Sequence, residues 1–265
     1  MKFNTLTLLF TALVLLYSCK NDKNQSQDSV EITEVDEGTT EATMTDSQVK
    51  VIPINHGTLV LETEDQVIYV DPVGGAEAFE GQKVPTMVLI TDIHGDHLNV
   101  KTLEALNLED ADIIVPQAIA EKLPEGLGKS IIVLDNGKST EVNSMTIEAI
   151  PMYNLREEAK NFHTKGRGNG YVLNITDERV YISGDTEDIP EMRNLKDIDK
   201  AFICMNLPYT MTVQSAASAV IDFKPKEVYP YHYRGKDGLS DVETFKSLVN
   251  KGTSNVKVVQ LGWYN

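Results

Sequence analysis

The sequence predicts an α/β fold in which two mixed β-sheets are packed between layers of helices. Two features of the order of elements carry this prediction. Three short strands come first and indicate an antiparallel meander, and later strands alternate with helices. That order favours two sheets sandwiched by helices over one doubly wound sheet. Residues 49–265 have the length expected of one domain with a sizeable core.

The first half of the domain begins with apolar or alternating runs bounded by turn residues. Asn55-His56-Gly57 indicates a hairpin turn between the first two strands, and Asp71-Pro72 ends the third. The predicted strands of this half cover residues 49–54, 58–62, 66–71, 86–90, 112–116 and 130–134. The predicted helices cover residues 100–106 and 118–123.

The second half continues in the same style. After Gly184-Asp185-Thr186 a helix is predicted through Glu191, with Pro190 near its first turn. The other predicted helices cover residues 213–221 and 242–249. The predicted strands cover residues 144–150, 170–175, 179–183, 201–205, 227–230 and 256–261.

Residues 1–18 have the pattern of a signal peptide. Lys2 is followed by an apolar run over residues 6–16, which is short for a membrane span. Leu16-Tyr17-Ser18-Cys19 is similar to a bacterial lipobox, so we expect cleavage before Cys19 and lipidation of that cysteine. An ordinary secretory signal with an incidental cysteine is the alternative. The lipobox predicts a protein anchored by lipid to the bacterial cell envelope, periplasmic or at the outer-membrane surface.

Residues 19–48 form a segment without periodicity that contains eight acidic residues and two lysines. These give it a charge of −6, out of −16 for the whole chain. Such a composition buries too little apolar surface to offset the entropy of ordering the chain. We therefore expect an acidic disordered linker that holds the domain away from the membrane.

The composition of the domain argues against one class of partner. Residues 49–265 keep most of the negative charge and show no basic stripe, which disfavours nucleic acid and leaves a small-molecule substrate as the expected partner. The oligomeric state is left open. If Cys19 is lipidated, Cys204 is alone, so no intramolecular disulfide is expected. Cys204 lies in the apolar run 201–205, which is typical of a buried core thiol.

The loop after the predicted strand 86–90 is the densest cluster of ligand-type side chains in the chain. Asp92, His94, Asp96 and His97 fall within six positions. Buried carboxylates and imidazoles are costly unless they are paired or bound to a metal. A solvated polar turn is the alternative, but this density favours a metal site.

Three later residues also lie beside predicted strand ends. Asp185 follows the strand 179–183, His232 follows the strand 227–230, and His163 lies in a loop before the strand 170–175. A single acid at such a place is more often a turn cap. Together with the loop they can supply one site with Asp92, His94, Asp96, His97, His163, Asp185 and His232.

This set of residues resembles the metallo-β-lactamase superfamily. The signature His-x-His-x-Asp-His is present as Asp92-Ile-His94-Gly-Asp96-His97, the acid that bridges two metals as Asp185, and the final histidine as His232. Four segments are similar to the ascorbate-phosphate-lactonase-like branch of metal-dependent hydrolases: Ile54-Asn-His56-Gly-Thr-Leu, Tyr153-Asn154, His163-Thr-Lys-Gly and Gly184-Asp-Thr…Pro190-Glu-Met. The resemblance covers about residues 51–261. It implies a four-layer αβ/βα sandwich with one or two divalent metal ions at the sheet edges.

Two positions depart from the family pattern. Asp92 replaces the first metal-binding histidine. Either Asp92 binds the first metal in a more oxygen-rich shell, or it does not reach that metal. In the second case only the second metal position fills well, the one formed by Asp96, His97, Asp185 and His232. Zinc is expected, with manganese and iron as alternatives. The third histidine is His163, unless the Tyr153-Asn154 segment takes that place.

The resemblance implies a hydrolase in which a metal-bound hydroxide, oriented by Asp96 as the catalytic residue, attacks a lactone, amide or phosphoester. His56, Lys165 and Tyr209 are candidate substrate-binding residues; each has a structural alternative as a turn, surface or packing residue. A catalytically silent binding lipoprotein with an incomplete metal site is the alternative function. A β-lactamase proper is disfavoured because Asp185 stands where the zinc β-lactamases have a cysteine.

Overall fold

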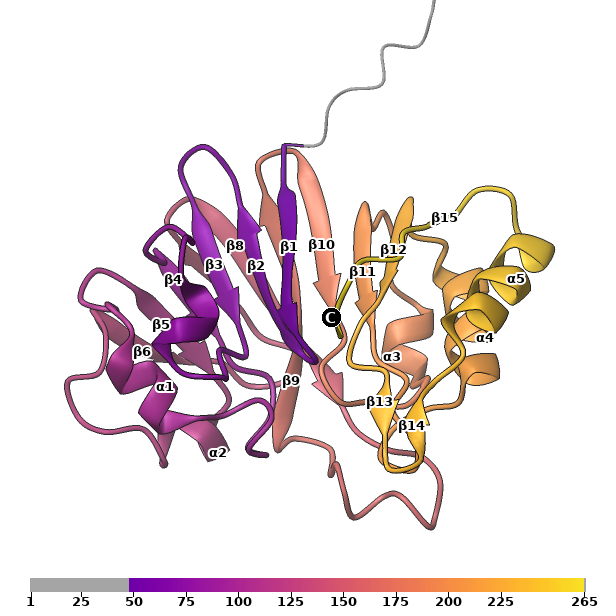
Figure 1. Ribbon diagram of the computed structural model, residues 1–265, viewed down its shortest axis with the longest axis horizontal. Coiled ribbons are helices and arrows are strands. Elements are labelled where there is room, and N and C mark those ends of the chain that lie inside the picture. The colour runs from indigo at the N-terminus through magenta and orange to yellow at the C-terminus, as the bar shows by residue number, and fades with distance from the viewer. Residues whose placement is uncertain (1–47, 265) are drawn as a thin grey trace, which may run out of the picture. The chain divides into compact units, whose positions relative to one another are not determined.

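The computed structural model describes residues 48–264 and places two mixed β-sheets between helices, as predicted (Figure 1). In the first sheet, β1 (Lys50–Asn55), β2 (Thr58–Glu62) and β3 (Val67–Val70) form the antiparallel meander. The chain then adds parallel strands β4 (Met87–Leu89), β5 (Asp112–Val115) and β6 (Ser130–Val133). The six strands follow one another in sequence order.

The second sheet has seven strands in the order β15-β12-β11-β10-β9-β8-β7. Its antiparallel part consists of β7 (Ser139–Val142), β8 (Met145–Met152), β9 (Gly168–Ile175) and β10 (Glu178–Ile182). Its parallel part continues from β10 through β11 (Lys200–Ile203), β12 (Glu227–Pro230) and β15 (Lys257–Val258). The short hairpin β13 (Arg234–Gly235) and β14 (Gly238–Leu239) lies outside both sheets.

Helices cover the outer faces of the two sheets. On the first sheet, α1 (Val100–Ala105) and α2 (Gln117–Ala120) pack Leu103 and Ile119 against apolar strand residues. The short 3-10 helix η1 (Ala76–Phe79) packs there as well. On the second sheet lie α3 (Pro190–Arg193), α4 (Val213–Phe223) and α5 (Val242–Gly252) (Figure 1). Among the described residues no helix combines the length and the apolar character needed to span a membrane.

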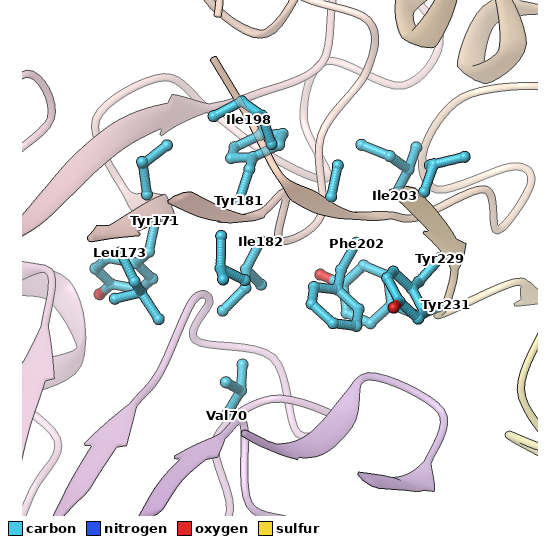
Figure 2. Packing of buried hydrophobic residues seen from close by; sticks show 14 of the residues in the cluster. Val70, Tyr171, Leu173, Tyr181, Ile182, Ile198, Phe202, Ile203, Tyr229 and Tyr231 are labelled. Atoms are coloured by element: carbon cyan, nitrogen blue, oxygen red, sulfur yellow. The ribbon is translucent and has the colours of Figure 1, made fainter. Parts of the chain in front are cut away.

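The main core lies between the sheets. Figure 2 shows side chains of β10 and β11 pointing alternately to the two faces of the second sheet, with Ile182 and Phe202 on the side of Val70 from the first sheet. This alternation is the period of two that a strand imposes on its side chains. Cys204 is fully buried in this core, as its apolar neighbours predict.

Several elements differ from the sequence-based prediction, and for three of them the structure shows why. Strand β7 was missed because only Val142 of its four residues is buried, so no apolar alternation marks it. The helix after Asp185 begins only at Pro190, because Thr186 and Glu187 use their polar groups to tie the loop to Tyr153 and Arg156. The last strand is shorter than expected because the chain leaves the sheet after Val259 donates to Val228.

The predicted signal peptide 1–18, Cys19 and the linker 19–48, apart from Gln48, lie outside the described residues. Within the described part the first strand begins at Lys50. The boundary between linker and domain stays a prediction.

Candidate metal centre

The ligand-type residues lie at the carboxyl ends of parallel strands. Asp71 follows β3 and the Asp92–His97 loop follows β4 in the first sheet, whereas Asp185 follows β10 and His232 follows β12 in the second. The carboxyl ends of parallel strands meet at one edge of a sheet, which is where open α/β folds place their sites. The two sheets therefore contribute opposite halves of one centre.

The first group consists of Asp92, His94 and His163. The Nδ1 atom of His94 lies 2.5 Å from Asp92 Oδ2, and the Nε2 atom of His163 lies 3.8 Å from the same oxygen. Asp92 and His163 are buried, and one ligand atom from each of the three residues lies within 4.8 Å of the others. The structure thus places His163 in this group, where the sequence left it open against Tyr153-Asn154.

The second group consists of His56, Asp96, His97 and His232, which together with Asp185 form two overlapping sets that share His232. The Nε2 atoms of His56 and His232 lie 3.4 and 3.3 Å from Asp96 Oδ2. His56 therefore lies among the potential ligands. From the sequence it was only a candidate for substrate binding.

Asp185 lies between the two groups. Its Oδ2 atom is 3.2 Å from Nε2 of His163 in the first group and 3.4 Å from Nε2 of His97 in the second. Its Oδ1 atom is 3.6 Å from His232 Nδ1. A single buried carboxylate thus faces both groups, as a bridging ligand must.

Buried polar atoms without hydrogen-bond partners test whether a metal fits. Four buried atoms of the centre have no partner with hydrogen-bond geometry in the described part of the chain: His97 Nε2, Asp185 Oδ1 and both ring nitrogens of His232. Buried polar groups are almost always satisfied, so four unsatisfied atoms in one cluster require an explanation. Imidazole nitrogens and carboxylate oxygens at these separations fit a divalent cation such as zinc.

Outer partners orient three of the histidines. The Nδ1 atom of His97 lies 2.7 Å from Asp71 Oδ2, that of His56 lies 2.7 Å from Tyr264 Oη, and that of His163 lies 3.4 Å from Asn154 Oδ1. In each ring the Nε2 atom is left to face the centre. Such partners fix the orientation and tautomer of metal-binding histidines.

Asp71 is the most deeply placed of these partners, and the sequence did not identify it. It is fully buried, accepts hydrogen bonds from the backbone N and the hydroxyl of Thr91, and contacts His97. The only signal in the sequence was an acid at the end of a strand, which we interpreted as a strand breaker. The contact with His97 depends on the pairing of β3 with β4, and no local pattern records that pairing.

The electrostatic environment couples the carboxylates to the imidazoles. Burial opposes charge on both, but the carboxylates of Asp185 and Asp71 raise the pKa of His97 well above its ordinary value. In turn His232 and His97, with the hydrogen bond from His163, overcome burial and hold the pKa of Asp185 well below its ordinary value. Without a metal the protonated ring of His97 is paired with Asp185 and Asp71, so a cation that binds here must displace that proton.

Asp92 has a further cationic partner, Arg167. The guanidinium nitrogens of Arg167 lie 3.2–3.3 Å from both carboxylate oxygens of Asp92. Burial would raise the pKa of Asp92, but His94, His97 and Arg167 together lower it. Asp92 is therefore an anion whose charge is partly balanced by Arg167.

The two remaining substrate-binding candidates lie in different surroundings. Tyr209 lines a cavity of about 290 Å³ together with His94, Asp96, His163 and Asp185. Lys165 lies outside that lining, where its Nζ atom bonds Glu191 and sits 4.7 Å above the ring of Tyr153.

The turn between β1 and β2 shows why one glycine is required at the centre. A Cβ atom at Gly57 would lie 2.6 Å from Cδ2 of His232. Backbone strain accompanies this close approach, because His56, Asp71 and His232 have φ angles of 53°, 46° and 46°, in the left-handed region that non-glycine residues rarely adopt. Such strain is often concentrated at functional sites.

Comparison with known proteins gives the family. Residues 50–232 match the β-lactamase superfamily domain. A UPF0173 metal-dependent hydrolase of Pyrobaculum islandicum is 31% identical over 228 residues, which cover 77% of this chain and 92% of the relative. One of Pyrococcus horikoshii is 29% identical over 211 residues, covering 76% and 92%.

Solved structures agree with these relatives. The crystal structure of a candidate metal-dependent hydrolase from Parabacteroides distasonis has 40% sequence identity and a TM-score of 0.71, covering 80% of this chain and 92% of that one. A metallo hydrolase of Ignicoccus hospitalis shares the fold, with 23% identity, a TM-score of 0.68 and coverage of 80% and 94%. The chain therefore belongs to the β-lactamase superfamily and, within it, to the UPF0173 family of metal-dependent hydrolases.

Proposed function

We propose that the protein hydrolyses a small carboxylic or phosphoric acid derivative at a centre of two divalent metal positions that share Asp185. The observation that carries the proposal is the position of Asp185 Oδ2, 3.2 Å from His163 and 3.4 Å from His97. Asp92, His94 and His163 would hold one ion. Asp96, whose carboxylate oxygens lie 4.0 Å from His97 Nε2 and 3.3 Å from His232 Nε2, would hold the other together with these two histidines. Zinc is the first choice, with manganese or iron as alternatives.

The chain's own residues set up the reaction. A divalent metal bound here supplies an acidic water and polarises the bond that is attacked. Asp96 and Asp185 both line the cavity, but the side chain of Asp96 is 43% exposed and that of Asp185 only 4%, so Asp96 is the carboxylate that can orient the attacking water. Asp71, Asn154 and Tyr264 hold His97, His163 and His56 in position from behind.

Loading and analysis of the purified protein test this proposal. Metal content should approach two ions per chain after loading with Zn²⁺ or Mn²⁺, and Asp185→Asn should lower the content of both positions. Hydrolysis of a panel of lactones, N-acyl amides and phosphodiesters should follow the metal content. Near-zero metal uptake by a folded wild-type chain would overturn the proposal.

The arrangement around Asp92 favours one alternative, a binding protein with an incomplete first position. Arg167 contacts both oxygens of Asp92 and competes there with a metal. The substitution Asp92→His separates the two cases. A gain of metal and of hydrolytic activity would support the incomplete site, whereas a fall in both would show that Asp92 is a working ligand.

We also propose that the protein is anchored to the cell envelope through lipidated Cys19. The support is the sequence alone, namely the short apolar run and Leu16-Tyr17-Ser18-Cys19. Mass spectrometry of the mature N-terminus tests it, with Cys19→Ala as the control. A mature chain that begins at another residue would contradict the lipid anchor. The ascorbate-phosphate-lactonase-like character of the substrate likewise stays a prediction.

A further inference from the structure

The cavity beside the two groups carries information about the substrate. Besides residues of the groups it is lined by Phe162, Asn206 and Tyr209. Asn206 follows β11, at the same sheet edge as Asp185 and His232. The potential metal ligands thus form one side of the cavity, and an amide and two aromatic rings complete it.

Asn206 presents a hydrogen-bond donor without a partner. Its side chain is buried, and its Oδ1 atom accepts the hydroxyl hydrogen of Thr210 at 2.5 Å, while that hydroxyl accepts from the backbone N of Asn206. The hydroxyl has one hydrogen, so this pair of bonds directs the amide oxygen toward Thr210. The Nδ2 group of Asn206 makes no hydrogen bond within the described residues, and Asn206 lines the cavity.

The aromatic pair forms an apolar wall. The rings of Phe162 and Tyr209 lie 5.2 Å apart in an edge-to-face arrangement. Their loops are tied together, because Asn154 donates to the backbone oxygen of Tyr209 and Arg156 donates to those of Pro208 and Thr210. Phe162 is 37% exposed, so it retains apolar surface for a ligand.

Among the described residues, no lysine or arginine lines the cavity. Three nearby cationic side chains are each paired with a carboxylate: Arg167 with Asp92, Lys165 with Glu191 and Arg156 with Glu187. An anionic group of a substrate would thus find no lysine or arginine among the described lining residues, whereas a carbonyl oxygen would find the Nδ2 hydrogens of Asn206.

Building on the proposed hydrolase, we infer that its substrate is a neutral ester, lactone or amide with an apolar substituent. The Nδ2 group of Asn206 donates to the carbonyl oxygen, and Phe162 and Tyr209 bind the substituent. Water adds to the carbonyl carbon, and the bond from that carbon to the leaving oxygen or nitrogen breaks. One proton of the water goes to the leaving atom and its oxygen stays in the acid. Negative charge develops on the carbonyl oxygen, where a fixed donor has its largest effect.

Kinetics on matched substrates test this inference. Metal-loaded wild type, Asn206→Leu and Phe162→Ala are assayed with 4-nitrophenyl acetate, 4-nitrophenyl hexanoate and bis(4-nitrophenyl) phosphate. Asn206→Leu should lower kcat on both esters by about 100-fold, the usual effect of losing one oxyanion donor. Phe162→Ala should raise KM for the hexanoate by about 10-fold and leave the acetate unchanged. Asn255→Leu, on an exposed loop, is the matched control and should change neither.

Two further measurements separate the outcomes. Metal content must be equal in all variants, and calorimetry should show that hexanamide binds the metal-free wild type more tightly than metal-free Asn206→Leu. If the loaded wild type hydrolyses none of these three substrates and none of the lactones and N-acyl amides of the wider panel, the proposed function fails, whereas hexanamide binding still tests the cavity. A wild type that prefers the phosphodiester, or an Asn206→Leu variant with unchanged ester kinetics, would overturn the inference about the substrate.

Discussion

The carboxylate of Asp71 should control metal affinity from behind the centre. It is fully buried and meets three donors: the backbone N of Thr91 at 2.7 Å, the Thr91 hydroxyl at 2.6 Å and His97 Nδ1 at 2.7 Å. In Asp71→Asn one oxygen becomes an NH₂ group, so at least one of these donors faces another donor. Loss of an outer partner of a metal-binding histidine typically costs 10- to 100-fold in affinity, or about 1.4–2.7 kcal/mol.

The same substitution should also destabilise the metal-free protein. A buried donor left without an acceptor costs about 1–3 kcal/mol in the free energy of unfolding. Zinc affinity is measured by competition with a chromophoric chelator, and stability by urea unfolding of the metal-free chain.

Asp112→Asn is the matched control for this prediction. Asp112 is also buried and has two partners, Lys129 at 2.8 Å and Ser130 at 2.7 Å, but it lies at the start of β5, away from the centre. The Asp112→Asn variant should be less stable than the wild type and should keep the wild-type zinc affinity. If Asp71→Asn kept the wild-type zinc affinity, or if Asp112→Asn lost as much zinc affinity as Asp71→Asn, Asp71 would not control metal affinity through His97.

Three other predictions follow from the structure. Gly57→Ala should weaken metal binding, because its Cβ would lie 2.6 Å from His232. Gly95→Ala is the control and should not weaken it, because nothing lies within 4 Å of its Cβ. Equal zinc affinities of the two variants would contradict this prediction. Burial raises the pKa of the Cys204 thiol to about 12, so peptide mapping should find Cys204 alkylated by iodoacetamide at pH 8 only after unfolding; rapid alkylation in the native state would count against the packing. The metal-free chain should be most stable between about pH 4 and pH 6.5. The lowered pKa of Asp185 contributes stability that is lost as the pH falls through the pKa of Asp185 in the folded protein. The raised pKa of His97 contributes stability that is lost as the pH rises through the pKa of His97 in the folded protein. Melting temperatures that rise steadily from pH 3 to pH 9 would contradict this prediction.

The sequence was most informative where residues near one another carry the structure. The apolar runs before Asp92 and Asp185 and the dense ligand loop are local patterns, and they predicted the strands and most of the candidate ligands. The order of a meander followed by strands and helices predicted the two mixed sheets. Weak alternation hid β7, and the hairpin β13–β14 has only two residues in each strand.

The parts that could not be predicted depend on contacts between distant segments. His56 reaches Asp96 from the turn between β1 and β2, where the backbone N of His232 donates to the backbone oxygen of His56. The contacts of Asp71 with His97 and of Arg167 with Asp92 likewise join residues far apart in the chain. Each requires the tertiary arrangement of the two sheets, which no spacing in the sequence records.

Asp185 is the residue that we propose joins the two metal positions. A crystal structure of the protein loaded with Zn²⁺ or Mn²⁺, with anomalous scattering measured at the metal edge, tests this most directly. We expect two anomalous peaks, one beside Asp92, His94 and His163 and the other beside Asp96, His97 and His232, with Asp185 within about 2.0–2.2 Å of both. A single peak confined to one group, or peaks that Asp185 does not contact, would contradict it.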